Sequence, residues 1–114
     1  MKRLDQIPLK PGDLRAIEEA ATVLRARLPV ASVILFGSKA RGDDDPESDI
    51  DLLVLTQRAL SREEERLVID LLFPLELKHD VVFSTLEIPV AEWNHGVYQV
   101  LPLRTEVDRD GVAA

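Results

Sequence analysis

The chain has 114 residues and a mass of 12.8 kDa, so we expect one domain over residues 1–114. A net charge of −7 and an aromatic content of 4% argue against direct binding of nucleic acid, because such surfaces are usually basic or rich in stacking rings. The absence of cysteine excludes disulfides and thiolate chemistry. No apolar stretch could span a bilayer or serve as a secretory signal, so we expect a cytoplasmic protein without membrane contact.

The first part of the chain predicts a helix, a strand and a tight turn. Apolar residues at helical spacing indicate an amphipathic helix over 14–28, for which Asp13 is a candidate cap. The β-branched run 30–36 is typical of a buried strand. Residues 38–42 predict a turn with one helical turn, and the acidic stretch that follows through residue 46 predicts a loop.

The second part of the chain alternates between strand and helix patterns. An alternating pattern that begins at Ser48 predicts a strand. One side of this strand carries Ile50, Leu52 and Val54, and the other carries Asp49, Asp51, Leu53 and Leu55. A capping box over 61–64 begins a helix that we expect Pro74 to end. Alternation over 75–83 predicts a third strand with Asp80 in its middle.

The remainder predicts two short helices, one over 89–93 and one between Pro102 and Gly111. Taken together, the order of elements predicts an α/β fold with a small mixed β-sheet and helices on one face.

Asp49 and Asp51 are the first candidate functional residues. At positions i and i+2 of a strand their side chains share a face, with Cα atoms about 6.6 Å apart. Two carboxylates directed into one small volume repel each other unless a cation lies between them, and oxygen ligands favour a hard ion such as Mg²⁺. The alternative is a strand whose charged side chains simply face solvent. These two residues alone leave the choice open.

Gly37 and Ser38 favour the functional interpretation. A glycine between a buried strand and a short helix lets backbone N–H groups approach an anion, and Ser38 adds a hydroxyl donor. Arg41, one turn further on, can reach a phosphate oxygen. An anion-binding turn at the end of one strand, beside paired carboxylates on the next, is what a metal-bound triphosphate requires.

Asp80 is the third candidate. An acid in the middle of an apolar strand needs a partner, and a strand next to that of Asp49 and Asp51 would bring three carboxylates together. A solvent-facing aspartate is the simpler alternative for this residue alone.

These motifs resemble the polymerase-β-type nucleotidyltransferase superfamily. Gly37-Ser38, ten intervening residues and Asp49-Ile50-Asp51 match its signature, and the stretch 37–42 is similar to that of its minimal nucleotidyltransferases. His79-Asp80-Val81 resembles the family's third, hydrophobic-flanked carboxylate, with His in an apolar place as a mild departure. The closing residues 103–112 also resemble the family's last helix and glycine.

The resemblance implies a polymerase-β-like fold and a site for metal and nucleotide. Asp49 and Asp51 would hold two Mg²⁺ ions, Asp80 would complete the metal site and accept a proton, and Gly37, Ser38 and Arg41 would bind ATP. It implies transfer of a nucleoside monophosphate to an acceptor hydroxyl, with release of pyrophosphate.

The resemblance also implies a partner, since minimal family members are typically paired with a helical HEPN-type protein as antitoxin to its toxin. We expect AMP transfer to such a toxin. Two alternatives remain: a non-catalytic module that neutralises its partner by binding alone, and an enzyme that modifies a small molecule such as an antibiotic.

Overall fold

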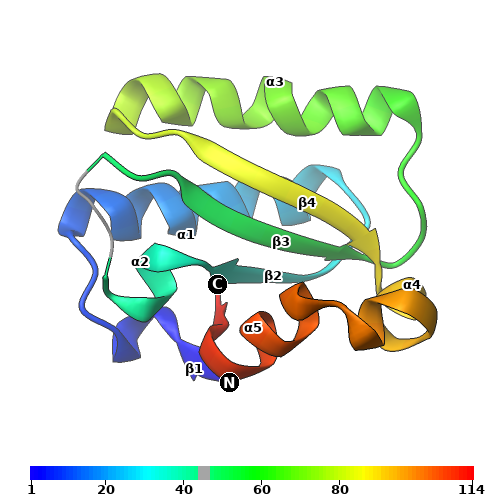
Figure 1. The fold of residues 1–114 in the computed structure, drawn as a ribbon. Coiled ribbons are helices and arrows are strands. Elements are labelled where there is room, and N and C mark those ends of the chain that lie inside the picture. The colour runs from blue at the N-terminus through cyan, green and yellow to red at the C-terminus, as the bar shows by residue number, and fades with distance from the viewer. Residues whose placement is uncertain (44–46) are drawn as a thin grey trace.

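The computed structural model describes residues 1–43 and 47–114 and contains a five-stranded sheet with helices on both sides (Figure 1). Residues 44–46 of the expected acidic loop, which include Asp44 and Asp45, lie outside the described residues. The strands are β1 (Lys2–Arg3), β2 (Val30–Phe36), β3 (Ile50–Thr56), β4 (Phe83–Pro89) and β5 (Val112–Ala113). The helices are η1 (Leu4–Gln6), α1 (Pro11–Arg27), α2 (Ser38–Arg41), α3 (Arg62–His79), α4 (Val90–Asn94), η2 (Gly96–Val100) and α5 (Pro102–Asp110).

The sheet is mixed, with strand order β1-β5-β2-β3-β4. β2 and β3 are antiparallel, and Phe36 at the end of β2 pairs with Asp51 near the start of β3. β3 and β4 are parallel, with Asp51 opposite Ser84. This topology confirms the predicted α/β fold with a small mixed sheet, but helices cover both faces of the sheet and not one alone. It also places the turn after β2 beside the first residues of β3.

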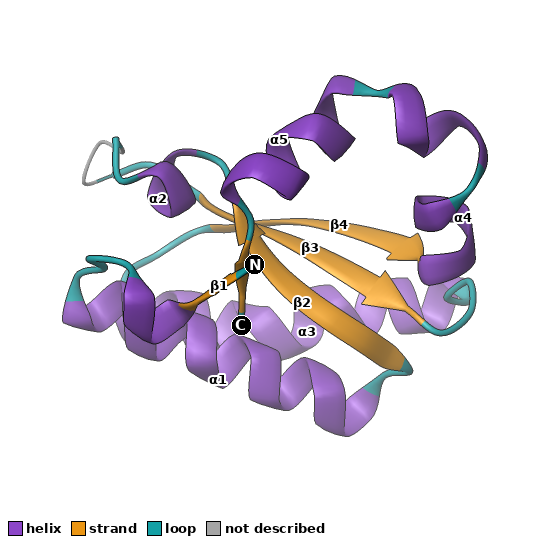
Figure 2. Ribbon diagram, turned by 90° about the horizontal axis from the view of Figure 1, so that it is seen from below, coloured by secondary structure: helices purple, strands orange, loops and turns teal. Residues whose placement is uncertain are grey.

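The two long helices, α1 and α3, cover one face of the sheet, as Figure 2 shows. The main core lies between them and that face. It includes Ile17, Leu24, Leu52, Val54 and Leu72, all of them almost fully buried. Ile50, Leu52 and Val54 therefore face the long helices, as their alternation predicts.

The other face of the sheet is covered by the short helices near the C-terminus. Leu53 and Leu55 of β3 pack there against Ile88, Trp93 of α4 and Val107 of α5. Asp51 follows the same alternation and faces this side. The sheet thus has a smaller second core, and the carboxylate of Asp51 lies at its margin.

Helix α3 is longer than predicted, and the expected strand over 75–83 is wrong. The capping box is confirmed, since Ser61 Oγ accepts from Glu64 N and Glu64 Oε1 accepts from Ser61 N. The helix nevertheless continues through Pro74 to His79. The last turn is held by α1: Lys78 Nζ and His79 Nε2 each lie 2.9 Å from a carboxylate oxygen of Glu19.

Asp13 also has a different role from the one predicted. Helix α1 begins at Pro11 with Lys10 as N-cap, so Asp13 lies inside its first turn. Its Oδ2 accepts a hydrogen bond from Lys39 Nζ of α2 at 3.0 Å, and both side chains are largely buried. This ion pair joins the short helix α2 to α1.

Among residues 1–43 and 47–114, no helix combines the length and the hydropathy needed to cross a membrane.

Candidate active site

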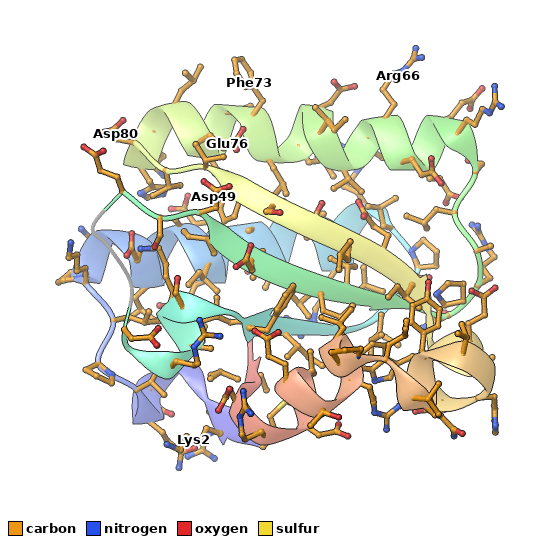
Figure 3. The ribbon with its side chains drawn as sticks, viewed as in Figure 1. Lys2, Asp49, Arg66, Phe73, Glu76 and Asp80 are labelled. Carbon is orange, nitrogen blue, oxygen red and sulfur yellow. The ribbon has the colours of Figure 1, made fainter. Side chains whose placement is uncertain are left out.

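The paired aspartates lie where β3 begins. Asp49 precedes the strand and is exposed, whereas Asp51 is its second residue and is partly buried. Figure 3 shows Asp49 beside the start of β3, and the register places Asp51 next to Phe36 at the end of β2. The antiparallel pairing of β2 and β3 therefore brings the carboxylates to the turn that contains Gly37.

Gly37 packs directly against the carboxylate of Asp51. Its backbone has φ +76°, and a Cβ built there would lie 3.2 Å from Asp51 Cγ and overlap Oδ2. Only glycine meets both conditions, because a side chain disfavours this φ and would displace the carboxylate. The predicted glycine turn and the predicted aspartate pair thus pack directly against each other.

The turn after Gly37 leads into α2, a single helical turn that ends at Gly42 with φ +80°. Ser38 is its first residue, and its hydroxyl donates to Ser48 Oγ at 3.4 Å. The N–H groups of a first helical turn have no intrahelical partner and favour an anion. The predicted turn over 38–42 is confirmed.

Arg41 extends from α2 toward α5 and makes two ion pairs. Its Nη1 lies 2.9 Å from Glu106 Oε1, and its Nε lies 3.2 Å from Asp43 Oδ2. Hydrogen bonds from Arg41 to these carboxylates raise the pKa of the guanidinium further above its ordinary value. Arg41 remains charged and is partly exposed, which suits contact with a phosphate.

Glu106 is a member of this cluster that sequence reasoning missed. Burial raises the pKa of Asp51 above its usual value, the negative charges of Asp49 and Glu106 raise it further, and Arg41 acts in the opposite direction. The ionised form of Asp51 is therefore disfavoured by its surroundings. A cation bound between Asp49 and Asp51 would relieve that repulsion.

Asp80 does not lie on a strand beside Asp51, where the sequence predicts it. It caps the C-terminal end of α3 in the left-handed conformation, with φ +53°, instead of standing in mid-strand (Figure 3). It lines a hollow of about 330 Å³ together with Asp13, Lys39, His79 and Ser48, the residue before Asp49, although neither Asp49 nor Asp51 lines that hollow. The position beside Asp51 on β4 is taken by Ser84.

The expected meeting of three carboxylates is accordingly absent from the described part of the chain. Residues 1–43 and 47–114 contain no group of three His, Cys, Asp or Glu side chains placed to share one metal ion. The donor set at β3 is Asp49 and Asp51. Two carboxylates still fit Mg²⁺, which commonly takes one or two protein ligands and completes its coordination with water and substrate phosphates.

The described geometry supports one kind of chemistry best. A glycine turn with free helical N–H groups and Arg41 offer ligands for phosphate oxygens, and the two carboxylates offer ligands for a hard cation. These ligands face each other across neighbouring strands. Such a site can hold a nucleoside triphosphate with its charge neutralised on two sides.

Comparison with known sequences agrees with this chemistry. The sequence profile described as "Nucleotidyltransferase domain" matches residues 17–92, a range that includes every predicted site residue but not Glu106. Two proteins of Methanocaldococcus jannaschii, the proposed protein adenylyltransferases MJ0141 and MJ0604, are each 38% identical to the chain. The first match spans 69 residues, 60% of this chain and 68% of MJ0141, and the second spans 74 residues, 63% and 69%.

Comparison with solved structures gives the same fold. The chain is similar to a proposed minimal nucleotidyltransferase, with a TM-score of 0.59 and 29% identity over 91% of this chain and 95% of the other. It is also similar to a chain of a toxin–antitoxin crystallised with AMP-PNP, with a TM-score of 0.58 over 87% of this chain and 69% of that one. The identity there is 20%, so this second likeness shows the fold alone.

Proposed function

Since the chain belongs to the nucleotidyltransferase domain family and is one of its minimal members, we propose that it transfers AMP from ATP to a hydroxyl group of a partner protein. The observation that carries the proposal is the packing of Gly37 on the carboxylate of Asp51. It joins an anion-binding turn to a cation-binding pair of carboxylates.

In this proposal Asp49 and Asp51 hold the divalent cation, with Mg²⁺ as the expected ion. The N–H groups of the turn at Gly37 and Ser38, with the guanidinium of Arg41, bind the triphosphate. The bound cation would neutralise phosphate charge and orient the triphosphate. Arg41 uses Nη1 for Glu106 and Nε for Asp43, so its contact with a phosphate oxygen either uses Nη2 or replaces one of these carboxylates.

The transfer exchanges one P–O bond for another. The acceptor oxygen bonds to the α-phosphorus, the bond from that phosphorus to the bridging oxygen of the β-phosphate breaks, and pyrophosphate leaves. The acceptor O–H bond breaks as well, and its proton passes to solvent water. Most of the protein's contribution is positioning and charge neutralisation, as in other phosphoryl-group transfers.

The role of Asp80 in the proposed reaction needs a test of its own. The family resemblance assigns it the third metal ligand and the proton acceptor, whereas it lies at the end of α3 and not on a strand beside Asp51. An Asp80→Asn variant tests this role. Loss of AMP transfer as large as in Asp51→Asn would support it, and retained transfer would leave the metal to Asp49 and Asp51.

The partner we propose is a helical, HEPN-type toxin, with this chain as its antitoxin. The relatives named protein adenylyltransferases support a protein acceptor, and the toxin–antitoxin with AMP-PNP supports both an adenine nucleotide and a toxin partner. The net charge of −7 suits a basic partner surface.

Labelled ATP tests the activity. The protein is incubated with Mg²⁺, the toxin candidate encoded beside it, and ATP labelled at either the α- or the γ-phosphorus. Transfer of the α label alone to the partner, lost in Asp49→Asn and Asp51→Asn, would support the proposal. Transfer of the γ label, or neutralisation of the partner by both variants without any label, would overturn it, the latter result indicating inhibition by binding alone.

A further inference from the structure

Two exposed side chains of β4 lie on the same face of the sheet as Asp51. Ser84 pairs with Asp51 in the parallel register, and Leu86 pairs with Leu53 two residues further on. Leu53 belongs to the second core, so alternation places Ser84 and Leu86 on the face that also carries Asp51. Ser84 is exposed, and Leu86 is 42% exposed. This part of β4 is therefore an open surface beside the candidate active site.

The helices on this face leave that surface accessible. β4 is the edge strand of the sheet on this side, as Figure 1 shows. Ile88, later in β4, is buried against Trp93 of α4, and α5 packs on β2. The cover on this face thus lies at the far end of β4 and over β2. A second protein can reach Ser84 and Leu86 without displacing a helix.

The candidate triphosphate site lies on the opposite side of Asp51. Asp51 pairs there with Phe36 of β2, and the anion-binding turn follows directly at Gly37 and Ser38. In the proposed reaction the β- and γ-phosphates held at this turn become the leaving pyrophosphate. The acceptor oxygen enters in line with the leaving group, from the other side of the α-phosphorus. The acceptor hydroxyl therefore arrives over β4.

An acceptor hydroxyl that enters from this side brings its own protein into contact with β4. Neighbouring strands are about 4.8 Å apart, and a strand advances about 6.6 Å over two residues. The backbone of Ser84 is therefore about 4.8 Å from that of Asp51, and the backbone of Leu86 is about 8 Å from it. Consecutive residues of a protein are about 3.8 Å apart, so the residues next to the acceptor reach both side chains.

We propose that Ser84 and Leu86 form the surface on which the acceptor segment of the partner protein docks, and that this segment carries an apolar side chain within two residues of its acceptor hydroxyl. Leu86 contacts that apolar side chain, and Ser84 Oγ hydrogen-bonds to the partner's backbone beside the acceptor. The inference rests on the proposed AMP transfer and names the kind of protein segment that this transfer uses. An aliphatic side chain and a hydroxyl offer no stacking ring for a base, which favours the acceptor over the adenine of ATP.

Kinetics with the toxin candidate encoded beside the chain test this surface. Leu86→Ser should raise the KM for the partner about tenfold, because it removes an apolar contact at the centre of the interface. It should leave the affinity for a non-hydrolysable ATP analogue unchanged. Leu77→Ser makes the same change at an exposed leucine of α3 and is the matched control, so it should alter neither quantity. Circular dichroism confirms that each variant folds.

The outcomes separate this inference from the proposed function. AMP transfer by the unmodified chain, with an unchanged KM in Leu86→Ser or an equal rise in Leu77→Ser, would overturn the inference alone. A weaker affinity of Leu86→Ser for the ATP analogue would also overturn it, because the surface would then bind the nucleotide. If the unmodified chain transfers no AMP, the proposed function fails and the inference fails with it.

A crosslink from position 86 tests the contact directly. The chain has no cysteine, so Leu86→Cys carries a single thiol to which a short photo-crosslinker can be attached. With the partner and the ATP analogue present, the crosslink should fall within about five residues of the hydroxyl that carries AMP after the reaction, whereas Leu77→Cys should give no such crosslink. Crosslinks to a distant part of the partner, or an acceptor with no apolar residue within two positions, would overturn the proposal.

Discussion

Gly37 and Asp51 are in direct contact across the β2–β3 junction, so the backbone of one motif forms the wall against which the carboxylate of the other rests. We expect Gly37→Ala to destabilise the fold by about 1–3 kcal/mol and to displace the Asp51 carboxylate, because φ is +76° and the new Cβ would overlap Oδ2. Chemical denaturation measures the first effect and Mg²⁺ titration the second.

Gly42→Ala is the matched control for that variant. Gly42 has φ +80°, but a Cβ there would meet nothing within 4 Å. It should therefore lower stability through backbone strain alone and leave Mg²⁺ affinity unchanged. Equal losses of Mg²⁺ affinity in the two variants would contradict the packing argument.

Removal of the Asp49 charge should lower the raised pKa of Asp51 toward its ordinary value, because Asp49 is the larger of the two repelling neighbours. An acid with a raised folded pKa costs stability as pH rises from its unfolded value, 3.8 for Asp51, through the folded value. Without metal, Asp49→Asn should therefore lose less stability than the unmodified chain as pH rises from 3.8 through the folded pKa of Asp51. Carbon-13 titration of the carboxyl groups and denaturation against pH measure the two quantities.

Magnesium should reverse the difference in stability between the unmodified chain and Asp49→Asn. Added Mg²⁺ should raise the melting temperature of the unmodified chain by several degrees and that of Asp49→Asn by much less, because the variant lacks one of the two ligands. The stabilisation should fade as pH drops and the carboxylates protonate. Equal stabilisation of both proteins at pH 7 would place the cation elsewhere.

Glu106→Gln should strengthen nucleotide binding. Glu106 accepts from Arg41 Nη1 at 2.9 Å, which offsets the positive charge of the guanidinium, and it adds negative charge beside Asp51. Because the pair is only partly buried, we expect a gain of about two- to fivefold in affinity for ATP analogues, measured by calorimetry. Asp108→Asn, on the same helix and paired with Arg104, is the control. A weaker affinity in Glu106→Gln would show that Glu106 positions Arg41 for the nucleotide.

Pro74→Ala should stabilise the fold by about 1–3 kcal/mol. Proline inside α3 lacks the N–H that would bond to the carbonyl four residues earlier, and alanine restores it without filling new space, because Pro74 is exposed. Denaturant unfolding measures the gain. A loss of stability would mean that Pro74 itself is needed to seat the last turn of α3 on Glu19.

Glu64 should make stability depend on acid pH. Hydrogen bonds from Arg58 and from the backbone of Ser61 lower the pKa of Glu64 from 4.5 to about 2. The stabilisation is present above pH 4.5 and is lost as pH falls from 4.5 toward 2. Replacement by Gln should flatten the slope of unfolding free energy over that interval, whereas Glu63→Gln should keep the slope contributed by Glu64.

The junction of β2 and β3 could be predicted from the sequence because its signals are local. A β-branched run, a glycine and alternating acids define two neighbouring strands, and antiparallel pairing joins their ends. Gly37, Ser38 and Asp51 consequently lie where the pattern predicts, whereas Asp49 lies one residue before β3 and not on it. The family match covers residues 17–92, a range that includes this junction.

The end of α3 could not be predicted in this way. Leu75, Leu77 and His79 alternate with polar residues as in a strand, and Pro74 is a strong helix-breaking signal. What decides the structure is tertiary: Leu75 packs on the main core, and Glu19 of α1 holds Lys78 and His79. The shift moved Asp80 out of the expected strand. Glu106 carries no local signal either, because its relation to Arg41 depends on how α5 returns across the sheet.

The buried pair of Lys39 and Asp13 determines how the turn at Gly37 can meet a ligand. Swinging α2 outward would break this ion pair and leave the carboxylate of Asp13 without Lys39 in a poorly solvated interior, at a cost of about 3–5 kcal/mol. We therefore expect α2 and the turn at Gly37 to be preorganised before the nucleotide binds, and not to move over it on binding. Adjustments on binding then fall to side chains such as Arg41.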